Sequence, residues 1–229
     1  MTAARARTVH LVTAVVAVAA LVLQTVLVVQ GSGVLDETEV PPLLTRLGRL
    51  VSYFTIQSNL LVAVTAVQLA RDPQRDGRWW RAVRVGAVVG ITVTGLVHFV
   101  LLRPLLHLDG ADWVADKLLH MVVPVLAVLG WLVAGPRPRA PWRDAVLALA
   151  WPVAWLVWTL AVGAATGWYP YPFLDVGVEG APAVAATCVG VTVLFLGLVA
   201  GLSALDRRMP PAPVRGTAPE PVGTAATAE

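Results

Sequence analysis

Long apolar runs alternate with short polar segments along most of this chain. Six of the runs are long enough for a helix to cross the hydrocarbon core of a bilayer, which takes about 20 residues. They lie near residues 8–30, 50–70, 84–103, 114–134, 145–167 and 181–204. The pattern predicts an all-α polytopic membrane protein, with a bundle of six transmembrane helices in residues 1–205.

The two ends of the chain need separate interpretations. The first run follows Arg5 and Arg7 and is much longer than the apolar part of a signal peptide, which has about 7–15 residues. We therefore expect it to be a retained transmembrane helix. Residues 206–229 are rich in Pro, Ala and Thr and have no periodic apolar pattern. Such a segment cannot bury enough apolar surface to fold, so we expect a disordered tail.

The composition supports the membrane class. Hydrophobic residues make up 57% of the chain and charged residues only 14%, whereas a soluble domain has about 25% charged residues. The arginines lie in short segments between apolar runs, so the basic character indicates membrane topology and not a nucleic-acid partner. Cys188 is the only cysteine, which excludes an intramolecular disulfide and a cysteine-based metal site. We expect no cofactor and no metal. Membrane lipids are the expected partners, and the sequence does not identify a protein partner.

The basic residues also predict the orientation. Thirteen fall on the side of the N-terminus and four on the opposite side. The thirteen are Arg5, Arg7, Arg71, Arg75, Arg78, Arg81, Arg84, Arg137, Arg139, Arg143, Arg207, Arg208 and Arg215, and the four are Arg46, Arg49, Arg103 and Lys117. Basic residues accumulate in cytoplasmic loops, so both termini and the tail are expected in the cytoplasm. The dominance of Arg, Ala and Val is typical of a GC-rich bacterial genome, and we expect the plasma membrane of a bacterium.

Polar side chains interrupt three of the runs at a common depth. Thr55 lies about five residues inside the second run, which at 1.5 Å per residue is about 8 Å below the outer surface. His98 lies a similar distance from the outer end of the third run, and His120 a similar distance inside the fourth. Thr55, Ser58 and Asn59 share one helix face, because they are spaced by three and four residues. We therefore expect these five residues to meet in the outer leaflet.

A carboxylate accompanies the second histidine. Asp112, Asp116 and His120 follow one another at intervals of four residues, and the only lysine, Lys117, is adjacent. Asp116 is therefore placed to orient the imidazole of His120. Ionisable residues inside a membrane are costly and usually functional, although His98 alone could serve as a hydrogen-bonding residue of the bundle. Pro124 lacks the N–H that would bond the His120 carbonyl, so we expect a loosened helix there.

The segment between the fifth and sixth runs, "GWYPYPFLDV" (residues 167–176), is the other unusual stretch. Its two X-Pro steps favour extended backbone. Tyr169 and Tyr171 carry amphipathic rings suited to the membrane interface, and Asp175 places an acid on the same side as the polar residues. The segment is either a rigid interfacial turn or a wall over the Thr55–His120 site.

Three blocks, "SYFTIQSNLLV", "DKLLHMVVPVL" and "WYPYPFLDV", occur in this order on the predicted six spans. In this respect the chain is similar to the bacterial Pr-six-Pr membrane proteins, which in turn resemble the eukaryotic androgen-induced (FAR-17a-like) membrane proteins. The resemblance covers residue 8 to about residue 204. It implies a multipass hydrolase of fatty acid esters of hydroxy fatty acids, with the threonine nucleophile at Thr55 and the histidine at His120.

The leading hypothesis is a membrane-embedded threonine hydrolase of lipid esters. Thr55 would be the nucleophile, His120 the base and Asp116 the residue that orients it. Ser58 or Asn59 would donate to the oxyanion, and His98, Lys117, Tyr169, Tyr171 and Asp175 would contact substrate. Two alternatives remain open. The same His/Asp cluster could serve a transporter or proton relay without enzymatic activity, or the polar residues could hold helices together in a structural or partner-binding protein.

Overall fold

The computed structural model describes residues 2–32, 40–137 and 142–210, and all regular elements in this part of the chain are helical. The long helices are α1 (Ala3–Gln30), α3 (Phe54–Arg71), α4 (Arg78–Val97), α6 (Val123–Ala134), α8 (Ala150–Thr166) and α10 (Ala181–Arg208). Shorter α-helices are α2 (Leu43–Ser52), α5 (Gly110–Lys117), α7 (Trp142–Leu147) and α9 (Val176–Glu179). Two π turns, η1 (His98–Leu102) and η3 (Leu118–Val122), and two 3-10 turns, η2 (Arg103–Leu105) and η4 (Pro172–Leu174), complete the order.

Several helices have the length and hydropathy of membrane spans, so the chain is a membrane protein of the all-α class. Four helical segments meet both requirements: Ala3–Gln30, Arg78–Leu105, Gly110–Ala134 and Ala181–Arg208. The second predicted run is not one straight helix, because α2 and α3 meet at an angle of 69°. Counted together as one bent span they bring the total to five.

The fifth predicted run, 145–167, is also divided. Its first residues belong to α7, and α8 begins at Ala150 with 17 residues. This is shorter than the helices that qualify as spans. The predicted tail differs as well, since residues 206–208 still belong to α10 and Asp206 is buried. The rest of the predicted disordered tail, residues 211–229, lies outside the described residues.

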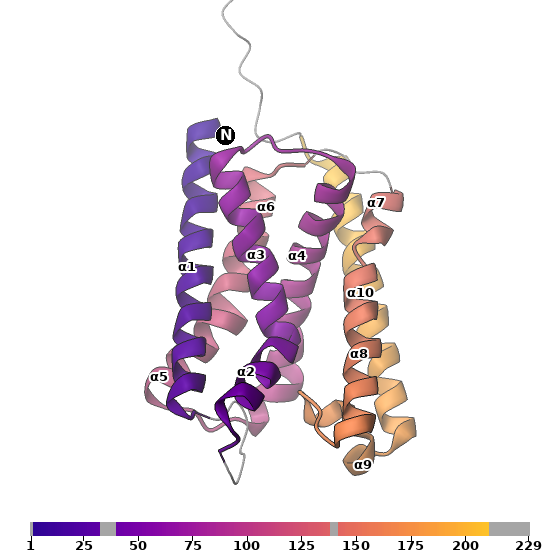
Figure 1. Cartoon of the computed structure of the whole chain (residues 1–229). Helices are drawn as coiled ribbons and strands as arrows, with labels where there is room; N and C mark the ends of the chain where they lie inside the picture. Colours follow the sequence, from indigo (N-terminus) through magenta and orange to yellow (C-terminus); the bar gives the residue numbers. More distant parts are fainter. Residues whose placement is uncertain (1, 33–39, 138–141, 211–229) are drawn as a thin grey trace, which may run out of the picture.

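The first half of the molecule is a four-helix bundle of α1, α3, α4 and α6 (Figure 1). Its centre contains small side chains that are almost fully buried, including Ala17, Ala20, Ala63 and Ala87. Small residues let helix backbones approach closely, which is how helices associate in lipid. This bundle therefore positions its side chains through close backbone packing.

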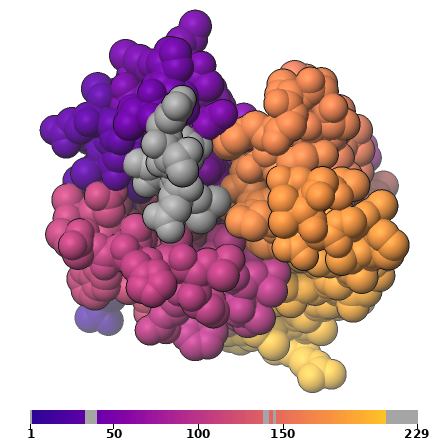
Figure 2. Space-filling model, turned by 90° about the horizontal axis from the view of Figure 1, so that it is seen from below, coloured from indigo at the N-terminus to yellow at the C-terminus, as the bar shows by residue number. Residues whose placement is uncertain are grey.

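Helices α8 and α10 form the second half and pack against α3 and α4. Trp151 of α8 stacks on Phe54 with ring centroids 4.5 Å apart and donates to Gln57 Oε1 at 2.9 Å. Trp155 donates to the carbonyl of Ser52 at 2.9 Å. Seen from the end that carries α2, α5 and α9, this half lies beside the first, with a notch at the boundary (Figure 2). The two halves are thus joined by aromatic side chains near the start of α3.

The sequence contains three GxxxG spacings, Gly86/Gly90, Gly163/Gly167 and Gly197/Gly201, and their surroundings differ. A Cβ at Gly90 would lie 2.6 Å from Trp151, and one at Gly163 would lie 2.0 Å from the ring of Tyr169. These two glycines make room for aromatic rings, not for a second helix backbone. Gly197 and Gly201 on α10 have no neighbouring atom within 4 Å of such a Cβ.

Candidate active site

Thr55 is the second residue of α3, directly after the bend. The backbone of Tyr53 is extended there, with φ −67° and ψ 129°, so α3 starts afresh inside the apolar part of the molecule. The first four N–H groups of a helix have no partner within it. The N–H of Thr55 is one of these, and it donates to the hydroxyl oxygen of Tyr171 at 3.2 Å. The bend therefore exposes a helix N-terminus, with its partial positive charge, at the threonine.

The hydroxyl of Thr55 contacts His120. Thr55 Oγ1 lies 3.2 Å from His120 Nε2 and 3.2 Å from the hydroxyl oxygen of Tyr171. On the other side of the imidazole, His120 Nδ1 lies 3.0 Å from Asp116 Oδ1 and 3.0 Å from the Asp116 carbonyl oxygen. Two acceptors at Nδ1 favour the tautomer with the proton on that nitrogen. The lone pair of Nε2 then faces the threonine hydroxyl.

A π turn places His120 at this position. In such a turn each N–H bonds the carbonyl five residues earlier, as Val123 does with Leu118. The next N–H in the series would belong to Pro124, which has none, so the carbonyl of Leu119 is left free. The side-chain amide of Asn59 donates to that carbonyl at 3.2 Å. The loosened helix that the proline predicts is therefore present, and Asn59 compensates for it.

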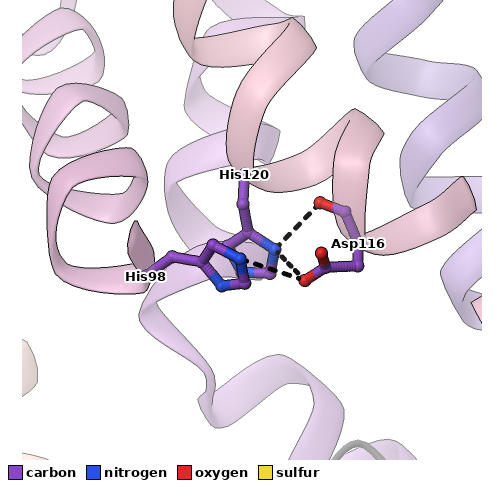
Figure 3. A group of neighbouring side chains, drawn as sticks. All are labelled: His98, Asp116 and His120. Atoms are coloured by element: carbon purple, nitrogen blue, oxygen red, sulfur yellow. Dashed lines mark hydrogen bonds and ion pairs between the residues drawn. The ribbon is translucent and has the colours of Figure 1, made fainter. Parts of the chain in front are cut away.

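His98 and Asp116 complete the cluster shown in Figure 3. The rings of His98 and His120 stack with centroids 4.0 Å apart and an interplanar angle of 13°. His98 Nε2 lies 3.4 Å from Asp116 Oδ1, and the side chain is only 2% exposed. Lys117 Nζ donates to the second carboxylate oxygen, Asp116 Oδ2, at 2.6 Å. Asp116 thus lies among two imidazoles and one ammonium, and His98 holds His120 in place by stacking.

The same three side chains bring possible metal-ligating atoms within 4.8 Å of one another. The lone pair of an imidazole nitrogen lies in the plane of its ring. Because the two rings are stacked and nearly parallel, their lone pairs lie in separate layers and do not converge on one ion. The absence of a metal stays a prediction.

Ser58 and Asn59, expected at the oxyanion, have other partners. Asn59 Nδ2 donates to the carbonyls of Thr55 (2.8 Å) and Leu119, and Ser58 Oγ contacts the Thr55 carbonyl and Thr94 Oγ1 at 3.0 and 2.9 Å. Both residues are fully buried. Neither residue lines either of the cavities at Thr55, so their role at the oxyanion stays a prediction, and the contacts just named join α3 to its neighbours.

The loop residues also divide into two groups. Tyr171 is buried against the edge of Tyr53, with ring centroids 5.6 Å apart, and its hydroxyl reaches Thr55. Burial raises the pKa of Tyr171, so the phenol stays protonated and able to donate. Tyr169 packs over Gly163, and the carboxylate of Asp175 accepts from the N–H groups of Gly177 and Val178 at the start of α9. The structure thus brings Tyr171, but not Tyr169 or Asp175, to the threonine.

Two cavities meet at Thr55. The larger, about 130 Å³, lies between α3, α4, α8 and α10, and its lining includes Trp155, Cys188 and Phe195. The smaller, about 70 Å³, lies between α1, α3, η1 and α5 on the other side of the threonine. Thr55, Leu102 and Tyr171 belong to both linings. The nucleophile candidate is therefore accessible from two sides.

Two polar residues at the cavities, one from α1 and one from α4, were not predicted from the sequence. Gln24 lines the smaller cavity, and Thr94 lines the larger one. Each is a polar residue within an apolar run, and that is the signal by which both could have been found. Asp112, which also lines the smaller cavity, belongs to the stripe of Asp116 and His120 but was given no role.

Comparison with known proteins gives no relative: the chain matches no family model, no curated protein and no solved structure. The chemistry of the site therefore has to be argued from its own geometry.

Proposed function

We propose that this protein is a membrane-embedded threonine hydrolase of lipid esters. The observation that carries the proposal is the continuous contact from Thr55 Oγ1 to His120 Nε2 and from His120 Nδ1 to Asp116. A threonine hydroxyl is a weak nucleophile unless a base takes its proton, and a base is effective when a third group orients it. These three side chains supply those roles within hydrogen-bonding distance.

The reaction follows from these contacts in two halves. His120 Nε2 takes the proton of the Thr55 hydroxyl while Oγ1 attacks the ester carbonyl. The tetrahedral intermediate then collapses, the alcohol leaves with the proton from His120, and the acyl group stays on Thr55. Water, deprotonated by His120, attacks the acyl-threonine, and the fatty acid leaves as the proton returns to Thr55. Asp116 stabilises the imidazolium that forms in each half.

The oxyanion would be stabilised from the side of Tyr171. The N–H of Thr55 and the hydroxyl of Tyr171 lie 3.2 Å apart next to Oγ1. If an ester carbonyl oxygen displaces the Tyr171 oxygen from this N–H, it can accept from the N–H of Thr55 and from the Tyr171 hydroxyl. A donor of this kind contributes about 3–4 kcal/mol to transition-state stabilisation. This assigns to Tyr171 the role that the sequence suggested for Ser58 or Asn59.

The membrane location of the site supports a lipid substrate. The larger cavity is lined by aliphatic and aromatic side chains, and its only polar side-chain atoms among the described residues are hydroxyls, one thiol and an indole N–H. It suits a hydrocarbon chain that enters from the bilayer. The resemblance to the Pr-six-Pr and FAR-17a-like proteins points to esters of the fatty acid ester of hydroxy fatty acid type.

The proposal includes a topology. We propose six crossings: α1, the bent pair α2–α3, α4 with η1, α5 with η3 and α6, α7 with α8, and α10. The distribution of basic residues then puts both termini in the cytoplasm of a bacterial cell and the site in the outer leaflet of the plasma membrane. Thr55, His120 and Tyr171 all lie toward the end of the molecule opposite the N-terminus, which is consistent with this orientation.

A transporter or proton relay is the competing function, and it needs a polar path to the other end of the bundle. The cluster of buried residues on the cytoplasmic side of the site includes Val62, Ile91, Val123 and Ala127, all apolar and at most 2% exposed. Apolar side chains at this level oppose ion movement and favour the hydrolase, although buried polar residues, among them His10, Thr65 and Arg84, occur elsewhere in the bundle.

Labelling with a fluorophosphonate probe tests the proposal. Wild type is expected to label, and Thr55→Ala and His120→Ala are each expected to abolish labelling. Thr65→Ala is the matched control, because Thr65 is a buried threonine on the same helix whose hydroxyl bonds only the carbonyls of Leu61 and Val62. Wild-type labelling in either site variant would show that the residue is not catalytic.

Thr55→Val tests the structural alternative, because it keeps the shape of the side chain and removes the hydroxyl. If the hydroxyl only joins helices, the variant will melt at a lower temperature without any loss of hydrolysis. The hydrolase proposal expects the opposite result: a folded protein without activity.

A further inference from the structure

The two cavities at Thr55 differ in chemistry, and this difference bears on which lipid ester fits. We call the larger one the α8–α10 cavity and the smaller one the α5 cavity. The lining of the α8–α10 cavity contains no charged residue among the described ones. The lining of the α5 cavity includes Gln24, His98, Asp112, Asp116 and His120.

The position of the base decides which part of an ester enters which cavity. In the proposed reaction, His120 returns its proton to the oxygen of the leaving alcohol, so that oxygen must lie on the His120 side of the ester carbon. His120 lines the α5 cavity and does not line the α8–α10 cavity. The alcohol arm therefore extends into the α5 cavity, and the acyl chain extends the other way, between α8 and α10.

The charges of the α5 cavity then restrict the alcohol arm. Asp112 and Asp116 are both in its lining, and none of the described lining residues is Lys or Arg. The nearest ammonium, that of Lys117, is already 2.6 Å from Asp116 Oδ2. Among the described residues, the side chain of Asp112 accepts a hydrogen bond from a neutral group, the hydroxyl of Ser32, at 2.5 Å. Asp112 is partly exposed and lines this cavity, so its carboxylate would repel an anionic group placed there.

We propose that the preferred substrates are esters whose acyl chain occupies the α8–α10 cavity and whose alcohol arm carries no negative charge. This inference rests on the proposed hydrolase function and narrows it. Among fatty acid esters of hydroxy fatty acids, it selects those whose own carboxyl group is esterified, as in a neutral lipid, over the free acids.

The experiment compares three esters of one fatty acid with the purified full chain in detergent micelles. Their alcohol arms have the same length and end in a carboxylate, a methyl ester or a trimethylammonium group. We expect kcat/KM for the methyl ester and for the ammonium compound to exceed that for the carboxylate at least tenfold. Equal or faster cleavage of the carboxylate would overturn the inference and leave the hydrolase intact. Failure of the wild type to cleave any of the three would count against the hydrolase itself.

A variant pair identifies the charge responsible. Asp112→Asn is expected to raise kcat/KM for the carboxylate and to leave the methyl ester almost unchanged, which narrows the discrimination. Asp109→Asn is the matched control, because Asp109 is exposed and lies outside both cavity linings. A discrimination that survives Asp112→Asn in a folded protein would contradict the assignment to this carboxylate, and the wild-type comparison of the three esters does not depend on either variant.

A second variant pair tests the direction of the two arms. Cys188 lines the α8–α10 cavity and Leu108 lines the α5 cavity. Cys188→Trp is expected to shift the preference toward shorter acyl chains without changing the preferred alcohol length, and Leu108→Trp is expected to do the reverse. The opposite pattern would show that the arms bind the other way round.

Discussion

The two halves of the molecule differ in how much of their long helices is buried, with 33% to 56% of the most apolar stretch in the three spans of the first half. In the most apolar stretch of Arg78–Leu105, 56% of the residues are buried inside the protein, whereas in that of Ala181–Arg208 only 17% are. The first half, with the helical turns that join its helices, contains Thr55, His120 and Asp116. The second half provides most of one cavity and, through the loop before η4, the hydroxyl of Tyr171.

Under the proposed function, this difference would correspond to a division of tasks. Proton transfer requires donors and acceptors held to within a fraction of an ångström, and the first half provides that through buried hydrogen bonds such as those of Asn59. A lipid chain of variable shape requires an adaptable apolar surface, and the second half provides it. We therefore expect substitutions in the first half to change the rate of the chemical step and substitutions in the second half to change substrate binding.

The largest effect is expected at the carboxylate of the first half. Asp116→Asn keeps the size of the side chain but removes the charge that stabilises the imidazolium of His120. By analogy with the orienting aspartate of serine hydrolases, kcat should fall by about 10³–10⁴-fold. The measurement is of kcat and KM separately, on a neutral ester. KM should stay within about twofold of the wild-type value, because the substitution does not change how the ground-state substrate binds. In Asp116→Asn the ammonium of Lys117 loses its partner, and the double variant Asp116→Asn/Lys117→Met controls for this effect. Activity close to wild type in either variant would contradict the proposed role of Asp116 in orienting and stabilising His120.

The next effect is expected at the hydroxyl that the second half contributes. Tyr171→Phe removes one donor next to Thr55 Oγ1 while the ring keeps its packing against Tyr53. Loss of one oxyanion donor lowers kcat by about 10²–10³-fold. Burial raises the pKa of Tyr171, so its phenol remains protonated at neutral pH. Deprotonation of Tyr171 is therefore not expected to lower the rate of hydrolysis near neutral pH. Tyr169→Phe is the matched control from the same loop. If both variants retain the wild-type rate, Tyr171 is a packing residue.

The sequence was sufficient to predict the parts of the site that depend on helix spacing. Intervals of four residues put Asp116 and His120 on one face, and equal depth put Thr55 at the same level, so their contact was predictable. Two features were not. At the bend at Tyr53, the carbonyl of Ser52 accepts a hydrogen bond from Trp155, which is distant in the sequence, and apolar periodicity does not reveal such a bend. The hydrogen bonds of Asn59 depend on a π turn and on a proline of another helix, so its role as a support for the backbone could not be read from its own segment.

The smallest effects compare the packing of the two halves directly. Gly90→Ala places a methyl group 2.6 Å from the ring of Trp151, so this ring or the helix that carries it must shift. Overpacking of this kind costs about 1–3 kcal/mol. Gly197→Ala adds the same methyl group to α10, where no atom lies within 4 Å of it, so the melting temperature should stay near that of wild type. The measurement is thermal unfolding of the two variants in the same detergent. A clear loss of stability in Gly197→Ala would mean that another molecule packs against α10 at this position. The difference in burial between the two halves would then not hold for the protein in the membrane.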